Sequence, residues 1–246
     1  NEARNHVVGA GISVFGVVFS GDPASATSSA KTEQWDNSSW TEVGDLSTAR
    51  ARCGSGGTGA SAFLASGTPN TGPTVVTGTE EWNFSSTLAA GAWASGGNLN
   101  TGRGLMGCTG IVTAGLVFGG TTPAVAVCET YDGSSWSEVG DLNTGVENNV
   151  GFGTSTAAVN CGGILAPAAN SDNTETWDGS SWTTSPADMN TARSKLSAAN
   201  QGTTTAGLVF AGSDPPGSAR NTALTESWNG SAWTEVGDLT TARRGG

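Results

Sequence analysis

The chain has 246 residues, of which only 13% are charged, and its formal net charge at pH 7 is −11. With ten Lys and Arg in total, most of the Arg at fixed repeat positions, the sequence offers no basic stripe for phosphates, and nucleic-acid binding is not expected. No run approaches the roughly 20 apolar residues of a membrane span, and residues 1–20 lack the basic start and apolar centre of a secretory signal. We therefore expect a soluble chain with no membrane partner.

Two columns of aromatic residues divide the chain into five copies of one unit. Successive first aromatics are 47, 49, 46 and 51 residues apart, and the two columns contain all nine tryptophans and the only tyrosine. The first column comprises Trp35, Trp82, Tyr131, Trp177 and Trp228, and the second comprises Trp40, Trp93, Trp136, Trp182 and Trp233. A unit of this length that fills the whole chain indicates a repeat architecture, and we predict that the aromatic columns are structural and pack between neighbouring units.

Each copy reads as four short strands. The first strand is rich in Gly and Ala and covers residues 7–11, 53–57 and 105–109 in the first three copies. The second is an apolar run with glycine close behind it, at residues 15–19, 62–65, 115–118, 157–161 and 206–210. A tight turn such as Asp-Gly or Asn-Gly joins the third and fourth strands, which cover residues 224–228 and 233–236 in the last copy. Extra residues before Trp93 predict a longer hairpin tip in the second copy.

Four antiparallel strands in fewer than about 50 residues, repeated along a chain, are typical of β-propeller blades. We predict one all-β domain over residues 1–246, a closed five-bladed β-propeller of four-stranded antiparallel blades, with blades at approximately 1–47, 48–99, 100–143, 144–190 and 191–246. Small residues in the first strand suit the crowding around a five-fold axis. The alternative is part of a six- or seven-bladed ring, because residues 241–243 begin a further repeat and echo residues 2–4.

The order of residues within each copy resembles the kelch repeat. A Gly-Gly pair follows the second strand at residues 119–120 and 162–163, a glutamate precedes the first aromatic, a tryptophan follows about five residues later, and an arginine precedes the next inner strand. The resemblance covers the whole chain and implies a kelch-like propeller, although the hairpin is compressed and several copies lack one or both glycines. Residues 233–243 are also similar to repeat modules in structural and receptor-binding proteins of marine bacteriophages, which implies a virion-associated or extracellular protein.

Glutamate and arginine recur at fixed positions. The glutamates near the start of the third strand are Glu33, Glu80, Glu129, Glu175 and Glu226, and the arginines before the first strand are Arg4, Arg50, Arg103, Arg193 and Arg243. Strand direction places both sets at the same end of the propeller, so we interpret them as repeated structural ion pairs. A carboxylate ring for a cation or a sugar is the alternative. Val146 replaces arginine in the fourth copy, where we expect an unpaired glutamate.

Catalytic and metal-binding patterns are not indicated. Four cysteines lie at four different repeat positions and His6 is the only histidine, so we expect free thiols, no metal and no cofactor. The hairpin at residues 178–182 resembles the Asp box of sialidases, but its Asp and Gly are adjacent. Retaining sialidases also need a tyrosine nucleophile, and the only tyrosine, Tyr131, stands at a tryptophan position of the repeat. The copper oxidases of the kelch fold need several His and Tyr ligands, which this chain lacks. No catalytic residue is predicted, and the chain is not expected to be an enzyme.

The loops between the second and third strands differ most among the copies. They cover residues 20–30, 66–78, 121–125, 164–173 and 213–223, and each contains proline. Because binding residues concentrate on loops carried by a rigid scaffold, we expect a non-catalytic recognition or assembly module that binds a glycan or a protein there. The candidate binding residues are Asp22, Asn70, Asp172, Asp214 and Arg220. A purely structural spacer or decoration protein is the second hypothesis, and a glycan-active enzyme the third.

Overall fold

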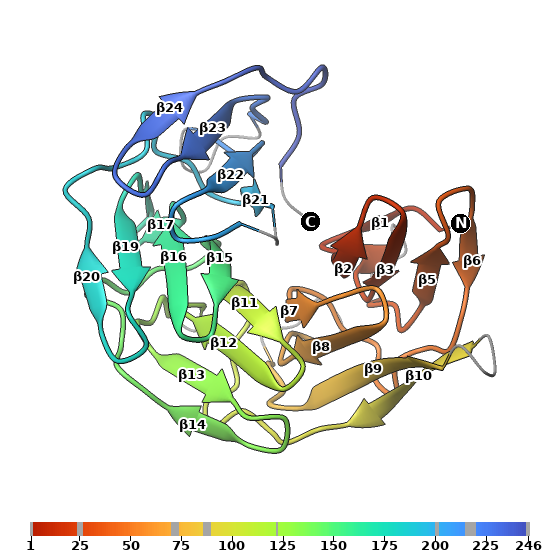
Figure 1. The fold of residues 1–246 in the computed structure, drawn as a ribbon. Coiled ribbons are helices and arrows are strands. Elements are labelled where there is room, and N and C mark those ends of the chain that lie inside the picture. The colour runs from red at the N-terminus through yellow and green to blue at the C-terminus, as the bar shows by residue number, and fades with distance from the viewer. Residues whose placement is uncertain are drawn as a thin grey trace.

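The strands form five four-stranded antiparallel sheets around a common centre. The computed structural model describes residues 2–23, 27–69, 74–85, 90–121, 123–199, 202–214 and 220–244, and no helix occurs in these ranges. Figure 1 shows the five sheets as blades, each running from an inner strand at the centre to an outer strand at the rim. The predicted five-bladed, all-β propeller is confirmed.

The blades follow one another along the chain. Blade 1 contains β2 (Val8–Ile12), β3 (Phe15–Phe19), β5 (Thr32–Trp35) and β6 (Trp40–Glu42). Blade 2 contains β7 (Gly54–Gly57), β8 (Ser61–Ala65), β9 (Thr79–Ser85) and β10 (Ala90–Ser95). Blade 3 contains β11 (Gly107–Ile111), β12 (Ala114–Phe118), β13 (Cys128–Tyr131) and β14 (Trp136–Glu138).

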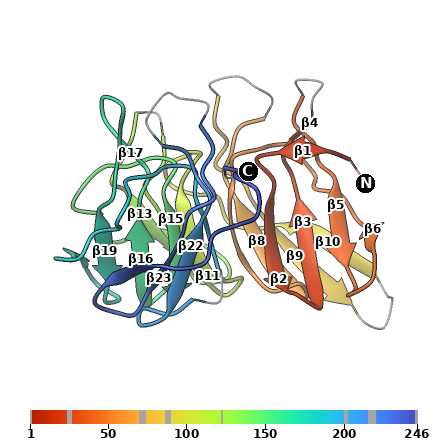
Figure 2. The ribbon, with the colours of Figure 1, turned by 90° about the horizontal axis from the view of Figure 1, so that it is seen from above.

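The last two blades have the same strand order. Blade 4 contains β15 (Val150–Thr154), β16 (Ala157–Cys161), β19 (Thr174–Trp177) and β20 (Trp182–Thr184). Blade 5 contains β21 (Ser197–Ala198), β22 (Gly207–Phe210), β23 (Thr225–Trp228) and β24 (Trp233–Glu235). Two short pairs, β1 (Arg4–Asn5) with β4 (Asp22–Pro23) and β17 (Ile164–Leu165) with β18 (Ala169–Asn170), lie at one end of the propeller, the upper edge of Figure 2. We call this end, to which the variable loops belong, the loop face.

The inner strands begin later than their composition predicts. In blade 3 the strand begins at Gly107 and not at Leu105, because Leu105 has a φ of 55°, which is incompatible with a strand. The second strands fall within a residue of their predicted bounds. In blade 2 the extra residues lengthen β9 and β10, which pair from Ala90 opposite Ser85 to Ser95 opposite Glu80. The predicted hairpin tip itself lies outside the described residues.

An aspartate or asparagine side chain closes the outer hairpins of blades 1, 3, 4 and 5. Asp178 Oδ1 accepts hydrogen bonds from the backbone N–H groups of Ser180 and Ser181, each at 2.8 Å. These bonds and those from the serine hydroxyls, with the Ser181 N–H contributing most, lower the pKa of Asp178 to about 2. Gly179 supplies the positive φ, 97°, that the turn needs. The residues that resemble an Asp box therefore form a turn.

Hydrophobic clusters fill the interfaces between consecutive blades. Between blades 4 and 5, Phe152 and Val159 pack against Trp228 and Trp233. The Trp233 indole N–H donates a 2.9 Å hydrogen bond to the Thr174 hydroxyl of blade 4, and two other second-column tryptophans do the same, Trp93 to Thr32 and Trp136 to Thr79. Corresponding clusters lie between blades 1 and 2, 2 and 3, and 3 and 4. Inner strands approach closely: a Cβ on Gly56 would lie 2.8 Å from the Gly110 carbonyl oxygen of the next blade.

No cluster among the described residues joins blade 5 to blade 1. Figure 1 shows the ring open between β21–β24 and β2–β6. Trp40, which would face blade 5 in a closed ring, is 41% exposed, whereas Trp136, Trp182 and Trp233 are 5%, 5% and 7% exposed. The structure thus has the predicted five blades, but it lacks the closing contact that we expected between the first and the last.

Candidate functional site

A buried arginine and glutamate pair stabilises four of the five blades, blades 1, 2, 3 and 5, near the loop face. In blade 5, Arg193 donates to the carbonyl oxygens of Ala211 and Leu224, at 2.8 and 2.9 Å, and to Glu226 at 2.6 Å. The other oxygen of Glu226 accepts a 2.7 Å hydrogen bond from the backbone N–H of Asn190, which belongs to the segment between blades 4 and 5. Equivalent pairs join Arg4 to Glu33, Arg50 to Glu80 and Arg103 to Glu129. Each glutamate therefore carries structural bonds.

Glu175 of blade 4 occupies the same position without an arginine. Val146 stands in the arginine position, and none of the salt bridges formed by the described residues involves Glu175. The carboxylate is buried and accepts hydrogen bonds from the backbone N–H and the side-chain amide of Asn143, at 2.8 and 2.9 Å. Arg243, in the last repeat, is exposed; its guanidinium donates to the Thr241 carbonyl oxygen and its backbone N–H donates to the Thr222 carbonyl oxygen.

A second repeated position, two residues after each arginine position, surrounds the mouth of the central channel. The residues there have φ between 53° and 59°: His6, Arg52, Leu105, Asn148 and Lys195. Backbone hydrogen bonds connect neighbouring blades at this level, from Leu105 N–H to Arg52 C=O at 3.0 Å, from Asn148 to Leu105 at 2.7 Å and from Lys195 to Asn148 at 3.0 Å. We call these five residues the mouth ring. Our sequence reasoning missed them, although three cationic or titratable side chains at one repeat position were a signal.

The mouth ring concentrates basic side chains in an acidic protein. Asp22 of β4 lies between two of them, with His6 Nδ1 at 3.2 Å and an Arg52 nitrogen at 3.5 Å from Asp22 Oδ2. Burial, followed by the positive charge of Arg52, lowers the pKa of His6 below 6.5, although Asp22 opposes this shift. Burial and the positive charges of Arg244 and Arg52 lower the pKa of Lys195. The mouth therefore brings the positive charges of Arg52 and Lys195 together with two carboxylates, Asp22 and Glu147, and Glu147 opposes the lowering of the Lys195 pKa.

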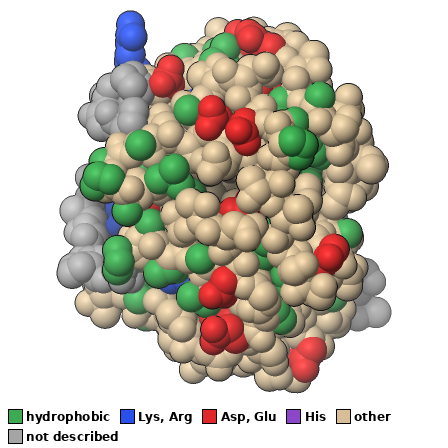
Figure 3. Space-filling view, turned by 90° about the vertical axis from the view of Figure 1, so that its left-hand side faces the viewer, with side chains coloured by type: hydrophobic (Ala, Val, Ile, Leu, Met, Phe, Trp, Pro, Cys, Tyr) green, Lys and Arg blue, Asp and Glu red, His purple; other side chains and the backbone are tan. Residues whose placement is uncertain are grey.

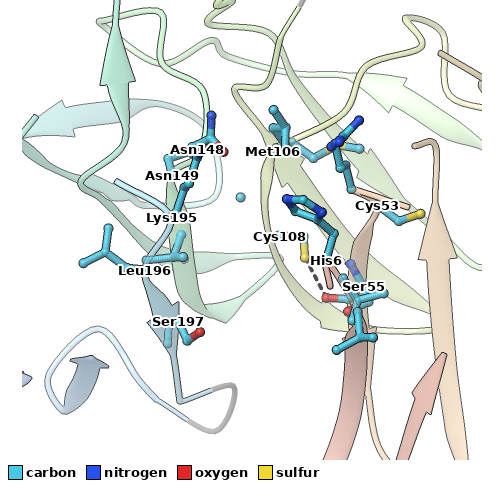
Figure 4. A pocket seen from close by; sticks show the side chains of 18 of the residues that line it. His6, Cys53, Ser55, Met106, Cys108, Asn148, Asn149, Lys195, Leu196 and Ser197 are labelled. Atoms are coloured by element: carbon cyan, nitrogen blue, oxygen red, sulfur yellow. Dashed lines mark hydrogen bonds between the residues drawn. The ribbon is translucent and has the colours of Figure 1, made fainter. Parts of the chain in front are cut away.

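Figure 4 shows the channel below the mouth ring, where Asn148, Asn149 and Lys195 face His6 and Met106 across an open space. This cavity has a volume of about 250 Å³. Deeper in the channel, the Cys108 thiol donates a 2.6 Å hydrogen bond to the Ser55 carbonyl oxygen. Burial raises the pKa of Cys108 to about 11 and the pKa values of Cys53, Cys128 and Cys161 to about 12. All four thiols are free, and none is activated as a nucleophile.

The loop residues predicted to bind a partner are not all brought together. Asp22 belongs to the mouth, while Asp214 and Arg220 lie exposed on the blade 5 loop, where the Asp214 N–H donates to the Arg220 carbonyl oxygen at 3.4 Å. Asp172 is half-buried beside β19, and its carbonyl oxygen accepts a bond from the Met189 N–H. Asn70 lies outside the described residues. A repeated aspartate, which stands in a Gly-Asp-Leu phrase in three copies and in Ala-Asp-Met in the fourth blade, was also not predicted. Asp45, Asp141, Asp188 and Asp238 each accept a hydrogen bond from the first backbone N–H of a third strand.

The outer rim differs from the mouth. Figure 3 shows the side that carries β20, where Asp and Glu side chains are scattered singly and few Lys or Arg are visible. The described ranges contain no group of three His, Cys, Asp or Glu side chains placed to hold a metal ion. Nor do those ranges include a helix long and apolar enough to cross a bilayer.

Comparison with known proteins adds no family. The sequence matches no protein-family model, and no curated protein matches it.

Proposed function

We propose that the protein is a non-catalytic recognition or assembly module, a kelch-like propeller that binds a glycan or a protein through its loop face in a virion-associated or extracellular setting. The observation that carries this proposal is the division between a constant frame and variable positions. The Arg–Glu pairs and tryptophans repeat from blade to blade, whereas the residues of the mouth ring and the variable loops differ in every blade. Variation on a rigid scaffold is typical of binding surfaces.

The charge at the mouth supports a partner that brings acidic groups. His6, Arg52 and Lys195 come from three different blades, and within the described ranges their only ion pairs are those of His6 and Arg52 with Asp22, although Glu147 also lines the mouth. An acidic sugar or a carboxylate-bearing peptide segment would complement these side chains, and its association would weaken with salt. The kelch and phage resemblances of the repeat support the recognition role and the virion-associated or extracellular setting.

The state of the titratable groups supports a non-catalytic role. Tyr131, the only tyrosine, is buried and donates its hydroxyl to Glu81, and burial is the first cause of its pKa rising to about 12. The carboxylates of the repeated glutamates form ion pairs with buried arginines or accept hydrogen bonds from backbone N–H groups.

A glycan array and a pull-down on intact cells, both with the unmodified chain, test the proposal. We expect a ligand whose binding falls when Arg52 and Lys195 are replaced by alanine. Ile111→Ser, on an exposed hairpin at the opposite end of blade 3, is the matched control and should leave binding unchanged. If binding survives both R52A/K195A and replacement of the variable loops by Gly-Ser linkers, the loop face is not the binding surface.

A structural spacer is the second candidate, and the uncovered faces of blades 1 and 5 favour it, since a spacer must contact neighbours. Recovery of the protein only within an assembled particle, with no glycan or cell ligand, would support the spacer over the recognition module.

A further inference from the structure

Consecutive blades are joined by a five-residue connector that ends at the arginine position. Four connectors, residues 46–50, 99–103, 142–146 and 189–193, bind both the blade before and the blade after them. In the first, Leu46 N–H donates to the Ala30 carbonyl oxygen of blade 1 at 2.9 Å, and Ser47 N–H donates to Glu80 of blade 2 at 2.7 Å. The Arg50 carbonyl oxygen accepts from Gly21 N–H of blade 1 at 3.0 Å, while its guanidinium pairs with Glu80.

Two further connectors border the opening, and each is bound on one side only. Residues 239–243 bind blade 5 in the usual way, through Leu239 N–H to Ala223 C=O and Gly212 N–H to Arg243 C=O, both at 3.0 Å. At the other end of the chain, Arg4 binds blade 1, through bonds to the carbonyl oxygens of Ser20 and Lys31 at 2.8 and 2.6 Å and to Glu33. The contacts of Arg243 with a following glutamate are missing among the described residues.

This arrangement does not fit closure of blade 5 directly on blade 1. A closed five-bladed ring has five junctions with one connector each, but here both residues 239–243 and the segment ending at Arg4 would occupy the last junction. The Gly212 N–H, which would have to bond the Arg4 carbonyl oxygen, is already bonded to that of Arg243. Five complete connectors and the end of a sixth at Arg4 match a ring with six blades.

The two faces at the opening also lack the cover that every other blade has. On blade 5, Phe210 and Leu239 are partly exposed, whereas their equivalents Phe19 and Leu46 are buried. On blade 1, no threonine hydroxyl among the described residues accepts the Trp40 indole N–H, whereas threonine hydroxyls accept those of Trp93, Trp136 and Trp233. The four interfaces between consecutive blades share one set of contacts. They therefore specify which side chains a blade placed in the opening would have to supply.

We propose that the faces of blades 1 and 5 bind between them a sixth blade of this same repeat, contributed by a second polypeptide. The incoming blade would offer blade 5 a tryptophan to cover Phe210 and a glutamate for Arg243, and would offer blade 1 a threonine hydroxyl for Trp40. Residues 239–243 already bind blade 5 and Arg4 already binds blade 1, so a second polypeptide would have to supply the four strands and the leucine that opens the next connector. This proposal is independent of the ligand proposed for the loop face.

The test uses a synthetic peptide with the sequence of residues 194–239, added to the intact chain. We expect a one-to-one complex by native mass spectrometry, in which hydroxyl-radical labelling of Trp40 falls to the level of Trp136. Trp40→Ala and Phe210→Ala should each weaken peptide binding about tenfold or more, because they remove aromatic anchors from the centre of the interface. Ile111→Ala, an exposed apolar side chain away from the opening, is the control and should not change it.

A peptide that carries Gln and Ala in place of its glutamate and second tryptophan, at the positions of Glu226 and Trp233, should not bind. The free peptide could fail to bind because it does not fold alone. A second variant, the chain extended after Arg243 by a copy of residues 194–239, tests for this. If neither arrangement protects Trp40, or if only the extended chain does, the proposal of a second polypeptide is wrong. Protection of Trp40 in the chain alone would overturn it too, by showing either self-closure in the monomer or pairing of two copies in a dimer.

Discussion

Glu226 and Glu175 occupy the same position of the repeat but differ in one neighbour. Glu226 neutralises the buried Arg193, so Glu226→Gln leaves a buried guanidinium without its counter-charge and is expected to cost about 3–5 kcal/mol. Glu175 has only hydrogen-bond donors from Asn143, and a glutamine oxygen can accept both, so Glu175→Gln should cost about 1 kcal/mol or less. Urea denaturation of the two variants measures the difference.

The pair of variants is its own control, because both make the same chemical change at the same depth in neighbouring blades. A lowered midpoint with unchanged denaturant slope would confirm that stability, and not the compactness of either state, has changed. Equal losses for the two variants would contradict the structural role assigned to the arginine pairs.

At this scale the sequence predicted the residues that repeat and not those that vary. The repeated arginines and glutamates, and the absence of an arginine for Glu175, were predicted by comparing the same position in the five copies. The mouth ring could not be predicted in this way, because glycine is the usual sequence signal for a left-handed backbone. The five residues of the ring adopt this backbone although none of them is glycine: His6, Arg52, Leu105, Asn148 and Lys195. The inter-blade hydrogen bonds that accompany this backbone cannot be anticipated from the residue types.

The elements that carry the stability are the blade interfaces, and the second tryptophan column allows them to be compared. Trp136→Ala removes a buried indole, its bond to Thr79 and its contact with Phe63, so we expect a loss of about 3–5 kcal/mol. Trp40→Ala removes the same residue from the uncovered face of blade 1 and should cost about 1 kcal/mol or less. Thermal unfolding followed by circular dichroism measures both.

Strand positions were predictable because apolar runs, glycine and hairpin turns mark them, and β3 spans the run Phe15–Phe19 as predicted. The inner strands were less predictable, since their small residues carry little pattern and the left-handed residue before each one delays its start. In blade 5 only Ser197–Ala198 remains as inner strand, a shortening for which the repeat gives no signal.

Over the whole molecule, the number of blades could be counted but the closure of the ring could not. A repeat pattern describes each interface between consecutive copies, yet says nothing direct about contact between the first and the last. The echo of residues 2–4 in residues 241–243 was the useful signal. The structure gives it a physical meaning, because the two segments border the same opening and bind different blades.

An open ring predicts unequal stability around the molecule. In a repeat protein each unit is stabilised by its neighbours, so blades 1 and 5, with one interface each, should open more often than blade 3, which has two. The chain supplies a matched pair of strands for this comparison, since residues 114–118, which form β12, and residues 206–210, which include β22, share the sequence Ala-Gly-Leu-Val-Phe. Their amides therefore have similar intrinsic exchange rates, and differences report protection. Native-state hydrogen exchange should be about tenfold or more faster in β22, whereas equal protection would mean that the ring unfolds as one unit or is closed in solution.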